Sequence, residues 1–102
     1  MIRGTTPGYE LHVSGADLRN STVYVTIAQG EDRKVTLSGA RLSITYSGNM
    51  STVTFTLTQQ ESLKFRSGRA SVQVKFSDGS GNVDATNIGD ITVLPTLNED
   101  VI

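Results

Sequence analysis

Short runs of alternating apolar and polar residues cover most of this sequence. In Thr52–Thr58, for example, Val53, Phe55 and Leu57 alternate with threonines. Strict alternation is the period of a strand with one buried face. Comparable runs place the other expected strands at residues 9–14, 22–29, 33–37, 41–46, 71–76 and 83–93. The sequence therefore predicts about seven short strands and no long helix.

A helical corner is predicted directly after the Thr52–Thr58 strand. Thr58 is followed three residues later by Glu61, the spacing of a capping box in which each residue's side chain bonds the other's backbone N–H. We expect one turn of helix near residues 59–64, anchored to the core by Leu63 and Phe65.

The segments between the runs carry turn chemistry. Ser47-Gly48-Asn49 is typical of a hairpin turn, because Gly and Asn tolerate positive φ. Asn87 or Gly89 is expected to bulge the last strand, which Pro95 ends because it has no N–H to donate. Leu18, in an irregular stretch, is expected to plug the edge of the core.

Strands separated by turns about every 8–12 residues are typical of a β-sandwich or small barrel. A helical turn that bridges two late strands suits an immunoglobulin-like sandwich, here a single domain spanning residues 1–102. The chain has no Cys and no Trp, so it lacks the disulfide and core tryptophan of antibody domains. The likeness is one of architecture.

Composition narrows the classes of partner. The net charge is −1 and charged residues make up 19% of the chain, so no basic field is available for nucleic acid. No polybasic or amphipathic segment suits a membrane surface. The absence of cysteine removes disulfides and thiolate metal sites. Residues 1–7 lack the apolar run of a signal peptide, and we expect a complete protein made in the cytoplasm.

One stretch has the oxygen spacing of a calcium loop. Its candidate ligands are Asp78, Ser80, Asn82 and Asp84. An EF-hand loop also needs a bidentate Glu at its twelfth position, where this chain has Gly89. A glycine-rich hairpin tip is the better interpretation.

The sequence contains few candidate catalytic residues. His12 is the one histidine, and no second imidazole, thiolate or Gly-x-Ser-x-Gly motif accompanies it. Carboxylates that could pair in principle are Glu10, Glu61, Asp84 and Asp90, but their spacing does not distinguish them from surface charges. We therefore assign no catalytic, cofactor-binding or metal-binding residue and expect a non-enzymatic protein.

Two surface features suggest recognition. A Thr-x-Thr row at residues 52, 54, 56 and 58 could suggest binding to ice or a crystal, but it is better explained as a solvated strand face. A carbohydrate- or cell-surface-binding adhesion module is the alternative function. It would need Tyr9, Tyr24 and Tyr46 to form an exposed cluster.

Three segments taken together resemble a known group of proteins. They are the opening Met1–Pro7, the corner Val53–Phe65, and Val72–Phe76 with the following Asp78-Gly79 and Ala85–Ile88. The ending, residues 94–102, fits the same group. Together they resemble small phage and prophage tail-associated proteins of Gram-positive bacteria, similar to the Ig-like N-terminal domain of siphophage baseplate upper proteins.

The resemblance implies a virion structural protein, a tail or baseplate component or an assembly adaptor, that binds other tail proteins and possesses no catalytic residues. The sequence shows no receptor-binding or coiled-coil extension, so we expect an adaptor, an accessory decoration or an assembly factor. Free sheet edges could receive an extended arm from a neighbour. The segments expected to supply such arms are Met1–Gly8 and Asn98–Ile102, which carry apolar residues that a monomer need not bury.

Overall fold

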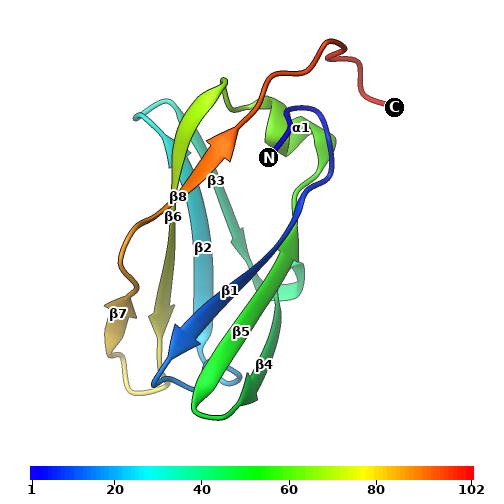
Figure 1. Cartoon of the computed structure of the whole chain (residues 1–102). Coiled ribbons are helices and arrows are strands. Elements are labelled where there is room, and N and C mark those ends of the chain that lie inside the picture. The colour runs from blue at the N-terminus through cyan, green and yellow to red at the C-terminus, as the bar shows by residue number, and fades with distance from the viewer.

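A computed structural model describes all 102 residues. Two antiparallel β-sheets pack face to face, so the predicted all-β sandwich is confirmed (Figure 1). The strands are β1 (Gly8–Ser14), β2 (Thr22–Gln29), β3 (Arg33–Ser38), β4 (Ser43–Ser47), β5 (Met50–Thr56), β6 (Gly68–Ser77), β7 (Val83–Ala85) and β8 (Gly89–Val93). A 3₁₀ turn, η1 (Gly39–Arg41), and a short helix, α1 (Gln59–Leu63), complete the fold.

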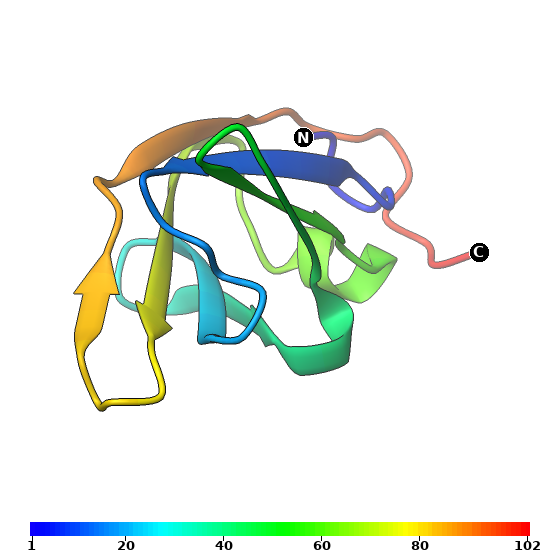
Figure 2. The ribbon, with the colours of Figure 1, turned by 90° about the horizontal axis from the view of Figure 1, so that it is seen from below.

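The connections follow an immunoglobulin-like Greek key. One sheet has the order β1-β5-β4, and the other has the order β3-β2-β6, with β7 and β8 both paired to β6. The chain crosses between the sheets after β1, β3 and β5, and hairpins join β2 to β3, β4 to β5 and β6 to β7. Figure 2, a view from one end, shows the two sheets as separate layers.

The last predicted strand is divided in two, which gives eight strands. Thr86 lies at the break, where its Oγ1 accepts a hydrogen bond from Val74 N at 3.1 Å and its N donates to Val74 O at 2.9 Å. A side-chain oxygen therefore takes the place of a main-chain partner, and the ladder is interrupted between Ala85 and Gly89.

The capped corner forms as predicted. Thr58 Oγ1 accepts from Glu61 N at 3.1 Å, and Glu61 Oε1 accepts from Thr58 N at 2.8 Å. Phe65, two residues beyond α1, is fully buried, whereas Leu63 is only half-buried. Neither α1 nor η1 is long and apolar enough to cross a membrane.

The inward rows of the strands make one core. Sixteen buried apolar residues form a single cluster, and among them Leu18 is 1% exposed, as expected for a plug at the core edge. Val53, Phe55 and Leu57 all point into this core, while Thr54 on the same strand is exposed. Alternation on β5 therefore divides a buried face from a hydroxyl-bearing solvated face.

Candidate functional site

The groups considered for metal binding and catalysis lie apart. No set of three or more His, Cys, Asp or Glu side chains is close enough to hold a metal ion. His12 lies on the exposed face of β1, where its Nδ1 is 3.2 Å from Thr52 Oγ1. This hydroxyl–imidazole contact lies on an exposed strand face.

The Asp78 carboxylate makes its hydrogen bonds within its own turn. It accepts hydrogen bonds from Ser80 N at 2.8 Å, Asn82 N at 3.2 Å and Asn82 Nδ2 at 3.2 Å. These bonds, the one from the Ser80 backbone first, lower the pKa of Asp78 below its usual value. The carboxylate thus closes a hairpin tip, the role expected for this glycine-rich stretch.

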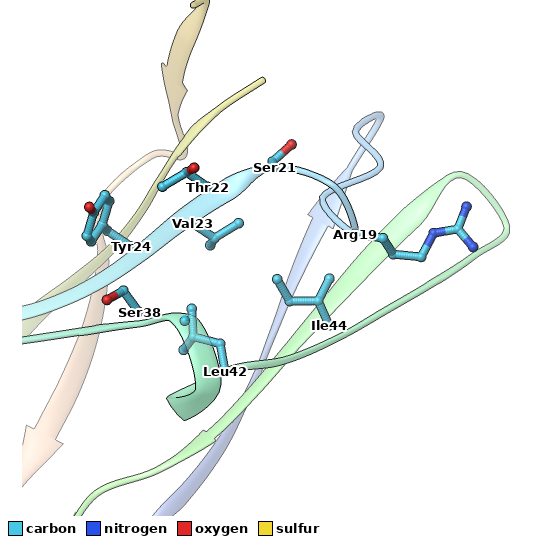
Figure 3. A pocket seen from close by; sticks show the side chains of 9 residues that line it. Arg19, Ser21, Thr22, Val23, Tyr24, Ser38, Leu42 and Ile44 are labelled. Carbon is cyan, nitrogen blue, oxygen red and sulfur yellow. The ribbon is translucent and has the colours of Figure 1, made fainter. Parts of the chain in front are cut away.

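A cleft lies at the side of the sandwich where β2 begins and β4 passes. Its volume is about 570 Å³. Val23, Leu42 and Ile44 form an apolar floor between the sheets, while Tyr24 turns away from the cleft centre at the rim (Figure 3). The other lining residues are Arg19, Ser21, Thr22, Ser38 and Gly39.

The cleft exists because β3 is shorter than β2. Ser38, the last residue of β3, pairs with Tyr24, so Thr22 and Val23 extend past the end of β3. The chain then turns through η1 (Gly39–Arg41) to enter the other sheet. This detour leaves the start of β2 and the outer edge of β4 facing each other without a strand between them.

The hydrogen-bonding register shows which groups of β4 are free. Bonds from Leu57 N to Pro7 O and from Gly15 N to Asn49 O mark the odd-numbered positions of β5 as the ones bonded to β1. The even-numbered positions of β5 therefore bond to their β4 partners, which are Ser43, Thr45 and Ser47. By the same alternation, the backbone N–H and C=O groups of Ile44 and Tyr46 point to the free edge.

Arg19 lies at one end of the cleft, where Asp17 orients its guanidinium. Its Nε and Nη2 donate to the two carboxylate oxygens of Asp17 at 2.9 and 2.6 Å, and its guanidinium carbon lies 5.1 Å from the centre of the Tyr46 ring. The hydrogen bond from Arg19 lowers the pKa of Asp17. Nη1 of Arg19 takes no partner, so one oriented cationic donor remains for a ligand.

The three tyrosines do not form the exposed cluster that the adhesion hypothesis needs. Tyr9 packs on Phe55 with ring centres 5.6 Å apart, and burial raises the pKa of its hydroxyl. Tyr46 lies under Arg19 and donates to Asn49 Oδ1 at 3.2 Å. Tyr24 is 45% exposed and is the one tyrosine that lines the cleft.

The N-terminal arm is fastened to its own domain. Ile2 and Leu94 form a parallel bridge, with Leu94 N donating to Met1 O at 2.7 Å and Arg3 N donating to Leu94 O at 3.1 Å. Gly4 N donates to Ser62 Oγ at 3.0 Å. The first of the two expected docking arms is therefore already engaged.

The C-terminal segment is attached more lightly. Arg3 pairs with Glu99, and Ile102 N donates to Gln59 Oε1 at 3.0 Å. The side chains of Leu97 and Ile102 are completely exposed. Two apolar residues thus stand in solvent on an extended segment.

Sequence reasoning did not identify Arg19 or the cleft beside it. The closest local signal is the Asp17-x-Arg19 spacing, which allows the ion pair but does not locate it beside the β4 edge. Compared with known proteins, the chain matches no protein-family model and no curated protein. Its function has to be argued from its own geometry.

Proposed function

We propose that this chain is a non-enzymatic structural protein of a phage or prophage virion, acting in the tail or baseplate or as an assembly adaptor. It would be made in the bacterial cytoplasm and built into the particle through contacts with other tail proteins. Its partners are proteins, including further copies of itself, and neither nucleic acid nor membrane.

The observation that carries this proposal is the uncharged, unpaired edge of β4 beside a cleft with an apolar floor. A free edge recognises an extended segment through main-chain hydrogen bonds, and a hollow beside it selects the side chains of that segment. Val23, Leu42 and Ile44 provide such a hollow. The resemblance of the capped corner around Thr58–Phe65 to tail-associated proteins adds the setting in which this contact would operate.

Immunogold labelling tests the proposal. Particles induced from the source strain would be purified and labelled with an antibody raised against the chain. Gold at the tail tip or along the tail is the expected result. Particles that carry no label and contain none of the chain by mass spectrometry would overturn the virion role.

The alternative, a carbohydrate- or cell-surface-binding module, retains one favourable feature. Tyr24 is exposed at the cleft rim, with the hydroxyls of Thr22 and Ser38 among the lining groups. A single ring offers one stacking surface for a sugar. A glycan array would reveal this activity, which the variant Tyr24→Ala should abolish and Tyr46→Phe should leave unchanged.

A further inference from the structure

We propose that the free edge of β4 accepts the C-terminal segment Leu97–Ile102 of a second copy as an added strand. This inference deepens the proposed function, on which its biological meaning rests, by naming the partner and the surface. One copy would supply the tail and the next copy would supply the edge.

Among the edge strands of the two sheets, β4 is the one without a charged residue. Charged side chains on exposed edges discourage pairing with other chains. The outer strands β1, β3, β7 and β8 all carry them, respectively Glu10, Arg33 with Lys34, Asp84 and Asp90. The sequence of β4 is Ser-Ile-Thr-Tyr-Ser, so nothing on this strand repels an incoming one.

The cleft gives the added strand a place for an apolar side chain. The backbone groups of Ile44 and Tyr46 face outward along the free edge, as the register shows. Residues of an added strand alternate between facing solvent and facing the space between the sheets. Those facing inward would cover Val23 and Leu42 at the floor of the cleft.

The C-terminal segment has the properties of the incoming strand. It carries the fully exposed Leu97 and Ile102, and two polar contacts tie it to its own domain. Six extended residues span about 20 Å, and the five residues of β4 span about 17 Å. The lengths therefore match.

Charge favours the same occupant. The Asp100 carboxylate has no cationic partner in its own copy, and Arg19 at the end of the cleft has an unengaged Nη1. An acidic tail entering this cleft would meet a donor already oriented by Asp17. The acidic residues of the tail also disfavour its insertion beside the other edges that carry Glu10, Asp84 or Asp90.

In its own copy the end of the tail lies at the α1 end of the domain, where Val101 and Ile102 line a hollow with Arg41. The C-terminal end lies beside α1, at the end of the domain opposite the β4–β5 turn (Figure 1). Ile102 is held there by Gln59. Because donor and acceptor are different surfaces, repetition of the contact produces a closed ring or an open chain. Either result suits a repeating tail structure.

Disulfide trapping gives a direct test, because the natural chain contains no cysteine. Thr45→Cys on the β4 edge would be mixed with Asp100→Cys on the tail, and the matched control would pair His12→Cys on the β1 edge with Asp100→Cys. A heterodimeric disulfide with Thr45→Cys alone is the expected result. Equal trapping at both edges, or none at either, would refute the proposed contact.

A double variant, Thr45→Cys with Asp100→Cys, distinguishes contact within one copy. If dilute protein forms a monomeric, internally linked product, the tail docks on its own domain and the inference is wrong. Covalently linked oligomers with no internally linked monomer would support it.

Light scattering on a concentration series provides an independent readout. The chain should associate, and Thr45→Lys should weaken association about tenfold by charging the edge, whereas His12→Lys should leave it unchanged. Circular dichroism would confirm that both variants fold. The protein could stay monomeric at millimolar concentration and still be detected on virion tails by the antibody. That result would refute this inference without contradicting the proposed function.

Discussion

Gly4 N donates to Ser62 Oγ at 3.0 Å, so the N-terminal arm and α1 share one hydroxyl. The same oxygen lies 2.8 Å from Thr5 O, to which the hydroxyl hydrogen can be donated. Ser62 is fully buried. The arm is therefore fixed by a part-buried polar contact.

Replacement of this hydroxyl should be costly. Ser62→Ala leaves Gly4 N–H and Thr5 C=O without this partner, and loss of a typical hydrogen bond costs about 0.5–1.5 kcal/mol. Urea denaturation should show that loss, and hydrogen exchange at the Gly4 amide should accelerate. Ser43→Ala, at an exposed position of β4, is the control and should change the free energy of unfolding by less than about 0.5 kcal/mol. Equal effects of the two changes would contradict the assigned role of Ser62.

The Arg41–Glu61 pair should make stability depend on pH. Two hydrogen bonds, of 2.6 Å from Nη2 and 3.1 Å from Nη1, join the guanidinium to the carboxylate. They are the main reason that the pKa of Glu61 is lowered from 4.5. A lowered folded-state pKa means that the stabilisation is present above 4.5 and is lost as the pH falls through the folded value.

Glu61→Gln should therefore unfold at lower urea concentration than the natural chain at pH 7, and the difference should be smaller at about pH 3. Glu10→Gln, at an exposed site without an ion pair, is the matched control and should show no such dependence. If Glu61→Gln lowered the stability of the chain equally at both pH values, the charge of Glu61 would not be the cause of the stabilisation.

The parts of the fold that the sequence predicts correctly are those set by neighbouring residues. The Thr58–Glu61 cap is a spacing of three residues, and the inward row of Val53, Phe55 and Leu57 is a period of two. Both are properties of one local segment. Neither depends on residues that are distant in the sequence.

Buried polar residues were harder to predict because their partners lie far away in the sequence. Ser51 is 0% exposed, with Oγ donating to Ala16 O at 2.6 Å and accepting from Leu18 N at 2.9 Å. Extending the inward row of β5 by one step places Ser51 in the core, although the strand expected from the sequence began at Thr52. Likewise, the cleft depends on where β3 ends relative to β2, which no local pattern specifies.

The β4–β5 turn should respond to changes at Asn49. Its φ is 63° and that of Gly48 is 60°, so both residues are in the left-handed region, as the sequence predicted for this turn. A β-branched residue is strained there, and Asn49→Val should cost about 1–2 kcal/mol. Asn49→Gly should be tolerated, since glycine enters this region without a Cβ penalty. Urea denaturation would measure the free energy of unfolding of both variants. Equal losses of stability would mean that the Asn49 side chain, and not its backbone φ, determines the stability of the turn.

Phe65 should be among the most sensitive positions of the core. It is 0% exposed and follows the capped corner, so its ring joins the connection between β5 and β6 to the interior of the sandwich. Phe65→Ala removes most of a buried side chain, which typically costs about 3–5 kcal/mol, and domains of this size are stable by only about 5–15 kcal/mol. Leu97→Ala removes a side chain that is already in solvent and should change the free energy of unfolding by less than about 0.5 kcal/mol. If thermal unfolding showed Phe65→Ala to be as stable as Leu97→Ala, the corner would not be anchored through this ring.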